Sequence, residues 1–350
     1  MPRAALGRSA SAPKAFSATI SRASRRHDKP SPGPYAAPPA IHILQVQMTE
    51  FLDTFRGSVN TWECDEVGHM NVQFYVARAS DAAFYLRHAL GLSPSRIRAE
   101  GRAMVALEEH IRFHRELRAG DIMNMRSRPV ELREKTMVSF HELFNSASGE
   151  TSATVVALSG HFDLEARKLI PWDDEAHAAA APFLGPLPAH AEPRSVPREK
   201  RLPAMRLEDA KDFIEIYRGA VMPWECDDFG HMNSRFYMAR FSDGAGHLWQ
   251  AIGFDKRAMM EKRRGTVVLE IRLNYLREVR SGTMLVAKST LTRVEGKTLT
   301  FVHYLFDAET GEAVATGEVI AIMLDLDARK SVAFTDEERD RLMPHVRALA

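Results

Sequence analysis

Apolar side chains recur every three or four residues in two stretches of the chain. In the first stretch they are Tyr75, Ala79, Ala82, Leu86 and Leu90, and in the second they are Tyr237, Phe241, Gly244, Leu248 and Ile252. This spacing places them on one face of an α-helix. Asn71 and Asn233 stand where each helix needs an N-cap, and Gly91 and Gly253 stand where each should end. We therefore expect one long helix in each half of the chain.

A different pattern follows each predicted helix. Residues 270–275 (EIRLNY) alternate polar and apolar side chains, which is the period of a β-strand. Other strands are predicted over the ranges 55–62, 217–224, 297–306 and 312–325, with a turn at 309–311. A long helix followed by an antiparallel meander is an α+β arrangement. Thr335 and Glu338 have the spacing of a capping box, which predicts a closing helix within 335–350.

The two halves of the chain are copies of one unit. Residues 56–81 (RGSVNTWECDEVGHMNVQFYVARASD) and 218–243 (RGAVMPWECDDFGHMNSRFYMARFSD) are identical at 17 of 26 positions, at a shift of 162 residues. The same shift continues without a gap and aligns Glu108 with Glu270. A match of this length excludes a short motif shared by unrelated domains. We therefore expect two domains of the same fold and of similar length.

We place the two domains at residues 48–172 and 206–334. The segments outside them differ from them in amino-acid composition. The linker between them, residues 173–205, contains six prolines and a run of alanines. Such a segment is expected to be extended or irregular. It can cross one face of a domain and bring the second domain beside the first.

Residues 1–47 have a composition of their own. They contain seven Arg or Lys against a single acid, Asp28, and are rich in Ser, Ala and Pro. We expect this extension to be disordered, because it cannot bury a core. It resembles an organelle transit peptide, which would direct the protein to mitochondria. The alternative, which the alanine- and arginine-rich style favours, is that translation starts at Met48 and the extension is a gene-model artefact.

Charge and cysteine content narrow the class of protein. The net charge of +1 gives no strong field that would attract nucleic acid or a membrane surface. No apolar run is long enough to predict a transmembrane helix. Two cysteines, Cys64 and Cys226, are too few for a disulfide scaffold and fit a reducing compartment. These features predict a cytoplasmic protein without nucleic-acid or membrane partners.

The densest chemical pattern is the motif WECDxxGHMN, at residues 62–71 and 224–233. Its acids, Asp65 and Asp227, end a predicted strand, and the glycine three residues later allows close approach of the backbone. A helix N-terminus with unpaired N–H groups follows at once. Such amides would stabilise the oxyanion that develops from a thioester carbonyl. The carboxylate could attack that carbonyl or activate a water molecule.

This motif resembles the one shared by hotdog-fold thioesterases of the 4-hydroxybenzoyl-CoA thioesterase family. In that family Asp-x-x-Gly-His-x-Asn precedes a tyrosine on the central helix, as Tyr75 and Tyr237 do here. The resemblance covers about residues 51–172 and 213–334. It implies a double hotdog: two tandem α+β domains, each a long central helix wrapped by a curved antiparallel β-sheet. In the family, paired domains hold the acyl-thioester sites in the groove between them.

The resemblance also implies roles for the motif residues. Asp65 and Asp227 match the family's catalytic acid, which serves as general base or nucleophile. Backbone amides of the turn are implied to polarise the carbonyl, and they belong to Gly68, His69, Gly230 and His231. Asn71 and Asn233 would order the turn and help to hold the water. Many relatives carry a glutamate on the central helix where this chain has Ser80 and Ser242, each followed by an aspartate, Asp81 or Asp243. A mechanism that needs the glutamate would require that adjacent aspartate. No cofactor or metal is implied.

Several motif residues also have structural interpretations. The aspartates could cap a turn, the histidines could serve as hydrogen-bonding side chains, and the asparagines suit helix caps better than chemistry. Cys64 and Cys226 are expected to be buried and structural rather than nucleophiles or metal ligands, because no further Cys or His cluster completes a ligand set. Trp62 and Trp224 are expected in the core, with contact to a cationic acyl group as the alternative. The neighbouring acids Glu63 and Glu225 are expected on a strand face.

Together these features predict hydrolysis of an acyl-CoA thioester to the free acid and CoA, at two sites that both have a complete motif. Three alternatives remain. An acyl-ACP thioesterase would need a basic docking patch, a hydratase or dehydratase would need a different acid–histidine pattern, and a non-enzymatic acyl-CoA sensor would need an effector module. We expect a homo-oligomer of double-hotdog chains, as relatives often form. The acyl group does not follow from the sequence.

Overall fold

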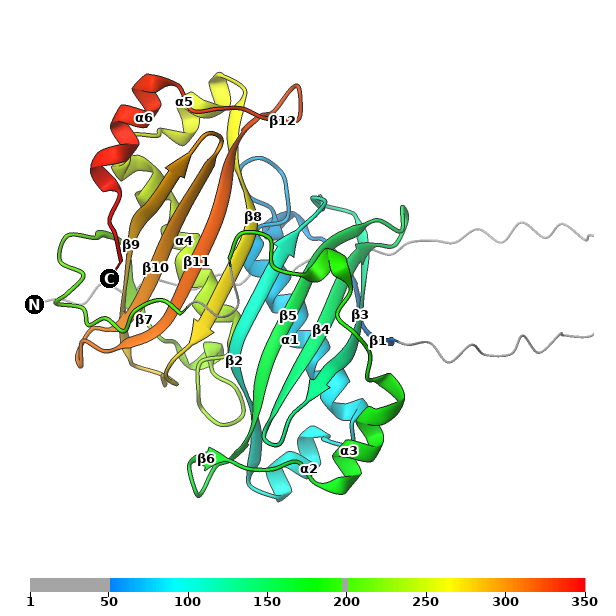
Figure 1. Cartoon of the computed structure of the whole chain (residues 1–350). Coiled ribbons are helices and arrows are strands. Elements are labelled where there is room, and N and C mark those ends of the chain that lie inside the picture. Colours follow the sequence, from blue (N-terminus) through cyan, green and yellow to red (C-terminus); the bar gives the residue numbers. More distant parts are fainter. Residues whose placement is uncertain (1–50, 197–200, 350) are drawn as a thin grey trace, which may run out of the picture. The chain divides into compact units, whose positions relative to one another are not determined.

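The computed structural model describes residues 51–196 and 201–349. The N-terminal extension predicted to be disordered, residues 1–47, lies outside this part of the chain. Each predicted domain forms a unit of one long helix and a set of antiparallel strands (Figure 1). The family resemblance therefore anticipated the architecture correctly, as an α+β double hotdog.

The elements of the first domain are β1 (Leu52–Ser58), η1 (Thr61–Glu63), α1 (Val72–Ala89), α2 (Pro94–Ala99), β2 (Arg102–Phe113), β3 (Ile122–Leu132), β4 (Thr136–Asn145), β5 (Thr151–Asp163) and β6 (Lys168–Leu169). Those of the second are β7 (Ile214–Ala220), η4 (Pro223–Glu225), α4 (Arg235–Ala251), α5 (Lys256–Glu261), β8 (Arg264–Tyr275), β9 (Met284–Glu295), β10 (Thr298–Asp307), β11 (Ala313–Asp325) and β12 (Lys330–Ser331). The linker holds α3 (Asp174–Ala180), η2 (Ala181–Phe183) and η3 (Ala189–Ala191), and the chain closes with α6 (Asp336–Leu342) and η5 (Met343–His345).

The strands of both domains join into one antiparallel sheet. Its order is β1-β3-β4-β5-β2-β8-β11-β10-β9-β7, and the short strands β6 and β12 pair with β5 and β11. The domains meet where β2 pairs with β8, from Glu108 opposite Asn274 to Arg112 opposite Glu270. Because the pairing is antiparallel and centred on equivalent strands, the two domains are related by an approximate twofold rotation.

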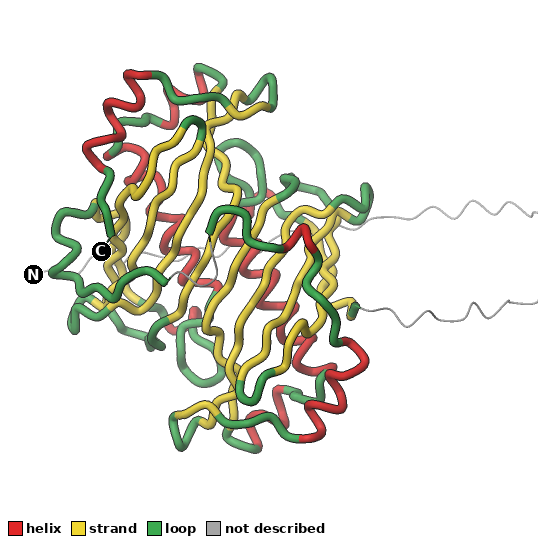
Figure 2. Tube along the Cα trace, viewed as in Figure 1, coloured by secondary structure: helices red, strands yellow, loops and turns green. Residues whose placement is uncertain are grey.

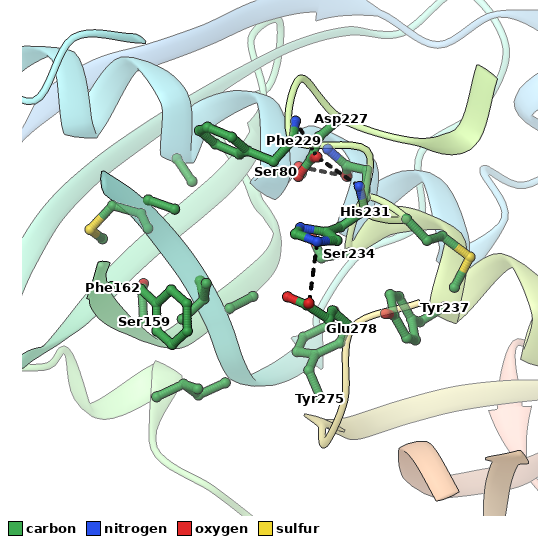
Figure 3. Close-up of a pocket in the computed structure, with 18 of the residues that line it drawn as sticks. Ser80, Ser159, Phe162, Asp227, Phe229, His231, Ser234, Tyr237, Tyr275 and Glu278 are labelled. Carbon is green, nitrogen blue, oxygen red and sulfur yellow. Dashed lines mark hydrogen bonds and ion pairs between the residues drawn. The ribbon is translucent and has the colours of Figure 1, made fainter. Parts of the chain in front are cut away.

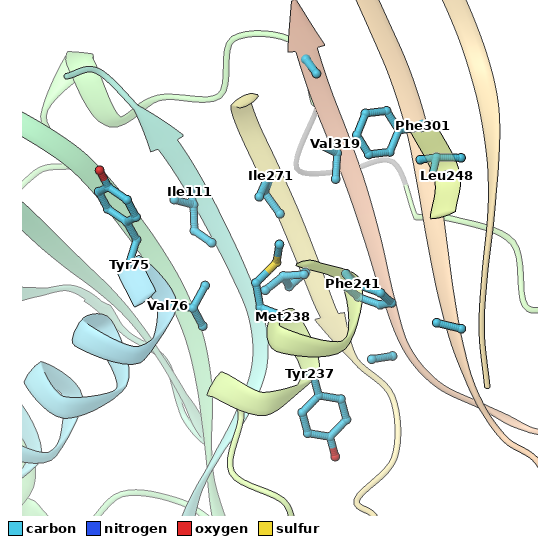
Figure 4. Close-up of a cluster of buried hydrophobic side chains, with 14 of the residues drawn as sticks. Tyr75, Val76, Ile111, Tyr237, Met238, Phe241, Leu248, Ile271, Phe301 and Val319 are labelled. Carbon is cyan, nitrogen blue, oxygen red and sulfur yellow. The ribbon is translucent and has the colours of Figure 1, made fainter. Parts of the chain in front are cut away.

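Both central helices lie on the same face of this sheet, side by side (Figures 1 and 2). Their apolar stripes pack onto the strands, and Figure 4 shows Val76 beside the strand of Ile111 and Met238 beside that of Ile271. The ring of Phe241 stacks on His303 of β10. The predicted limits are confirmed for α1, whereas α4 has Ser234 and not Asn233 as its N-cap residue. Asn71 Oδ1 accepts a hydrogen bond from the amide of Gln73 at 3.1 Å, which is the N-cap contact.

The opposite face of the sheet is crossed by the linker (Figure 1). The Glu270 carboxylate accepts hydrogen bonds from the amides of Arg194 and Ser195, and Arg112 Nη1 donates to the carbonyl of His190 at 2.7 Å. The prediction of an extended or irregular linker was wrong for its first part. Asp173 caps helix α3 by accepting from the amide of Ala176 at 2.8 Å, so a local N-cap and an alanine run form a helix before the prolines begin.

The prediction for the acids that precede each cysteine was also wrong. Glu63 and Glu225 do not lie on a strand face but in the short helices η1 and η4, where both are buried. Each carboxylate forms an ion pair with an arginine on the central helix, Arg78 for Glu63 and Arg240 for Glu225. These buried pairs tie the start of each motif to the middle of the helix behind it.

Candidate active site

Hydrogen bonds within the motif form a tight turn around Asp227. The amide of Asp227 donates to the carbonyl of His231 at 2.8 Å, and the amide of Gly230 donates to the carbonyl of Asp227 at 2.9 Å. Gly230 has a φ of 76°, a left-handed conformation that favours glycine. The side chain completes the turn, because Asp227 Oδ1 accepts from the amides of Phe229 and His231 at 2.9 and 3.1 Å. The Asp65 turn has the same pattern.

This turn leaves one carboxylate oxygen and one amide free for chemistry. Oδ2 of Asp227 accepts no hydrogen bond from residues 51–196 or 201–349. The amides of Gly230 and His231, which the resemblance assigned to the thioester carbonyl, are used inside the turn instead. At the start of α4, Asn233 accepts from the amides of Arg235 and Phe236, and the amide of Ser234 has no acceptor within the described part of the chain.

His231 is held by neighbouring charged side chains. Its Nε2 lies 2.8 Å from Arg280 Nη2 and 3.3 Å from Glu278 Oε1. Nε2 therefore faces both a guanidinium, which can only donate, and a carboxylate, which can only accept. Glu278 also pairs with Arg167 of the first domain at 2.5 Å. These contacts support the structural interpretation of this histidine, as part of a polar network at the boundary between the domains.

A cavity of about 800 Å³ opens beside the Asp227 turn. Figure 3 shows Asp227, His231 and Ser234 on one side of it and Phe162 and Ser159 of the first domain on the other. Most of its walls come from the first domain, from α1, α2, β2 and β5, and are apolar; they include Ala83, Leu86, Leu92, Ile97, Met104, Val105, Leu107, Ala157 and Leu158. The motif of the second domain thus faces an apolar chamber inside the first.

Direct contacts between the domains position this site. Ser80 Oγ on α1 donates to Asn233 Oδ1 at 3.3 Å, and Arg235 pairs with Asp81 at 2.6 Å. Ser80 lines the cavity, but Asp81 is held by Arg235 and by Arg78 and does not line it. Asp81 is therefore not placed to replace the missing helix glutamate at the Asp227 site.

The equivalent space beside the Asp65 turn is filled by larger side chains. At a shift of 162 residues, Arg87, Leu92 and Ser139 of the cavity wall correspond to Trp249, Phe254 and Phe301. These three aromatic residues are buried, and the Trp249 ring packs edge-on against Phe254 and Phe301 at centroid distances of 6.0 and 6.2 Å. They belong to the main hydrophobic core. Complete motifs in both domains therefore do not give two equal sites.

One polar residue of the cavity wall has no place in the motif. Glu109 on β2 is 5% exposed, and its Oε2 accepts a hydrogen bond from the Tyr275 hydroxyl at 3.0 Å. Burial raises the pKa of Glu109 to about 7, although the Tyr275 hydroxyl acts in the opposite direction. Glu109 lies far from the motif in the sequence, so the motif did not predict it as a site residue. The signal was present as a difference between the repeats, since Glu109 aligns with Ile271.

The raised pKa of Glu109 predicts a pH-dependent stability. The pKa of a glutamate in the unfolded chain is near 4.5, so the folded protein binds the proton of Glu109 more tightly than the unfolded chain does. The stabilisation that this proton gives is full below about pH 4.5 and is lost as the pH rises through about 7. We expect Glu109→Gln to raise the free energy of unfolding by up to about 3 kcal/mol above pH 7 and to change it little near pH 4.5. Urea unfolding at both pH values measures this. Glu134→Gln, an exposed control, should show no such trend, and an equal effect of Glu109→Gln at both pH values would contradict the assignment.

Other predicted site residues lie elsewhere. Trp62 and Trp224 are 75% and 72% exposed on η1 and η4, so their expected place in the core was wrong. Neither lines the cavity beside Asp227. Tyr237 lines the cavity, whereas Tyr75 is buried in the core beside Phe113. Cys64 and Cys226 are half-buried. The backbone of Cys64 forms an isolated antiparallel β-bridge with that of Met70, which closes the turn, and Cys226 pairs with Met232 in the same way. Among the described residues, no group of three or more His, Cys, Asp or Glu side chains could hold a metal ion.

Comparisons with known proteins agree with this architecture. The model of the thioesterase-like superfamily matches residues 59–180 and 221–342. A betainyl-CoA thioesterase of Pseudomonas aeruginosa is 30% identical over 137 residues, which are 39% of this chain and 84% of that protein. A chloroplastic acyl-acyl carrier protein thioesterase of Arabidopsis thaliana is 25% identical over 134 residues, 38% of this chain and 70% of that protein.

Among solved structures, a putative oleoyl thioesterase of Lactobacillus plantarum has the same fold over 77% of this chain and 95% of its own, with a TM-score of 0.59 and 15% identity. The 12:0-ACP thioesterase of Umbellularia californica covers 78% of this chain and 94% of its own, with a TM-score of 0.57 and 16% identity. The two-domain arrangement and the paired motifs are those of a thioester hydrolase. The chain belongs to the thioesterase-like superfamily. None of its described helices has the length and apolar character needed to cross a membrane.

Proposed function

We propose that this enzyme hydrolyses acyl-CoA thioesters at the Asp227 turn and holds the acyl group in the cavity of the first domain. The observation that carries the proposal is the continuity between Asp227 and an apolar chamber of about 800 Å³. An acyl chain needs such a chamber, and a thioester needs a carboxylate at its entrance. The betainyl-CoA thioesterase relative supports CoA as the thiol component.

Asp227 and Ser234 supply the chemistry in this proposal. The free Oδ2 of Asp227 either attacks the carbonyl carbon, giving an acyl anhydride that water then hydrolyses, or removes a proton from the attacking water. The amide of Ser234, at the positive end of α4, takes the oxyanion in place of the amides used inside the turn. In the first route the C–S bond breaks as the anhydride forms and CoA leaves as a thiolate; water then attacks the acyl carbon of the anhydride, which regenerates the Asp227 carboxylate and releases the proton that the thiolate takes up. In the second route water adds to the carbonyl, and the C–S bond breaks as the proton held by Asp227 passes to the departing thiolate. Both routes end with CoA as the thiol and with an oxygen of water in the free acid.

The mouth of the cavity suits the charged part of CoA. Arg98, Arg167 and Arg277 line it, and about half of each side chain is exposed to solvent. Each forms an ion pair with an acid, which a phosphate group could displace because arginine binds phosphate in two-pronged geometry. The same cations could meet an acidic carrier protein, so acyl-ACP is the second candidate substrate, and the Arabidopsis relative favours including it in the test.

A thiol-release assay tests the proposal. The full chain would be given acyl-CoAs with short, long, branched, aromatic and cationic acyl groups, and the same acyl groups on a carrier protein. We expect turnover of at least one acyl-CoA class, with acyl-ACP cleaved more slowly or not at all. Cleavage of acyl-ACP alone would replace CoA by a carrier protein. Binding of acyl-CoA without thiol release would reject hydrolysis in favour of a sensor.

A further inference from the structure

Glu109 is a buried carboxyl group in the acyl cavity, and it takes no part in the chemistry at Asp227. One of its oxygens, Oε2, accepts from the Tyr275 hydroxyl at 3.0 Å. The other, Oε1, has no hydrogen-bond partner in residues 51–196 and 201–349, although the side chain is nine-tenths buried and lines the cavity. A carboxylate in such surroundings is costly unless a partner reaches it.

Aromatic rings connect this carboxylate with the catalytic turn. Tyr237, which lines the same cavity as Asp227, packs edge-on against Tyr275 at a centroid distance of 5.3 Å. Tyr275 in turn donates to Glu109. Figure 3 shows both tyrosines on the same side of the cavity as His231. Asp227, these two rings and Glu109 therefore line one cavity that the acyl group would occupy. Aromatic faces and a carboxylate are the groups with which proteins bind organic cations.

The equivalent positions beside the Asp65 turn, where aromatic side chains fill the space, show that the fold does not need these polar groups. At the equivalent positions, Glu109 is replaced by Ile271, Tyr275 by Phe113 and Ser234 by Val72. Ile271 is fully buried in the main core, so an apolar side chain packs at this place without difficulty. The acid is present only in the domain that has an open cavity, which points to a ligand rather than to the stability of the sheet.

We propose that Glu109 is a specificity-determining residue that selects acyl groups carrying a positive charge. This proposal rests on the proposed function of the Asp227 site. The apolar walls take the alkyl part of the acyl group, the rings of Tyr237 and Tyr275 contact the cation, and Oε1 of Glu109 neutralises its charge. The hydroxyl of Tyr275 holds the carboxylate in position.

A pair of substrates with the same shape tests this selectivity. One acyl-CoA ends in a trimethylammonium group and the other in the isosteric tert-butyl group, prepared at several chain lengths that begin with betainyl-CoA. We expect the parent enzyme to prefer the cationic member by about tenfold to a hundredfold in kcat/KM. Glu109→Gln should abolish the preference by raising KM for the cationic member while kcat for the neutral member is kept. Tyr275→Phe should weaken the preference, because it removes the hydroxyl and keeps the ring.

Matched measurements separate this proposal from that of hydrolysis. Glu134→Gln removes the same charge at an exposed position and should leave the preference unchanged. Equal turnover of both members by the parent enzyme, or a preference retained in Glu109→Gln, would overturn the role of Glu109 and leave the hydrolase intact. If no acyl-CoA is cleaved, the role of Glu109 is still tested by the dissociation constants of thioether analogues of the two substrates, which the enzyme cannot cleave. A cationic analogue that binds no more tightly than its neutral isostere would then reject the proposal.

Discussion

Replacement of Asp227 by Asn should lower kcat for acyl-CoA hydrolysis by about 10²- to 10⁴-fold, the contribution expected of an acid–base or nucleophilic side chain. Asparagine is the same size and can keep Oδ1 as the acceptor for the amides of Phe229 and His231, so the turn should survive. What is lost is the basic oxygen that faces the cavity. Thiol release under saturating substrate measures the effect, and the KM should change little.

The repeat provides a matched control for this variant. Asp65→Asn makes the same change in a turn with the same hydrogen bonds, but the space beside that turn is filled by Trp249 and its aromatic neighbours. Burial raises the pKa of Asp65, as expected for a carboxyl group removed from water. We expect Asp65→Asn to keep most of the activity. Equal losses in the two variants would show that both turns are catalytic, and full activity in Asp227→Asn would place the chemistry elsewhere.

Replacement of Glu225 by Ala should lower the free energy of unfolding by about 3–5 kcal/mol. Glu225 is 5% exposed, pairs with the equally buried Arg240, and accepts from the amide of Met222 at 2.8 Å. Its removal leaves the buried guanidinium without the carboxylate that pairs with it directly. The loss can be followed as a fall in the thermal or urea midpoint, with circular dichroism as the probe.

Two further variants isolate the buried charge as the cause. Glu215→Ala breaks a similar pair with Arg218 on the surface, where exposed pairs contribute at most about 1 kcal/mol. Replacing Glu225 and Arg240 together by apolar residues of similar size should restore much of the lost stability, because no unpaired charge remains. A double variant that is less stable than Glu225→Ala would mean that packing, and not charge, dominates at this place.

Patterns within a few residues were enough to predict much of the molecule. The helical stripe from Tyr75 to Leu90, the cap at Asn71 and the stop at Gly91 all depend on backbone hydrogen bonds that close within four residues, and they lie where predicted. The turn at Asp227 is equally local, since its hydrogen bonds span at most four residues. The duplication then predicted two copies of the same fold.

Other features depend on residues that are distant in the sequence. Trp62 belongs to a motif that is conserved between the repeats, and nothing local shows that η1 turns its ring towards solvent. The pairing of β2 with β8, which joins the two domains into one sheet, brings together residues about 160 positions apart. Such contacts join residues that are far apart in the sequence, so a pattern within a few residues does not predict them.

The sequence alone therefore determined the fold of each domain and its duplication, because both follow from short-range patterns and from their repetition. The chemistry of the motif stays a prediction from the same patterns. Only the tertiary structure decided that the domains are unequal. Arg87, Leu92 and Ser139 leave room for the cavity beside Asp227. At the equivalent positions beside Asp65, the larger side chains of Trp249, Phe254 and Phe301 pack against one another and fill that room. No sequence pattern singles out any of these six residues. The volume that they enclose or fill depends on how a helix, a loop and a strand pack together in space.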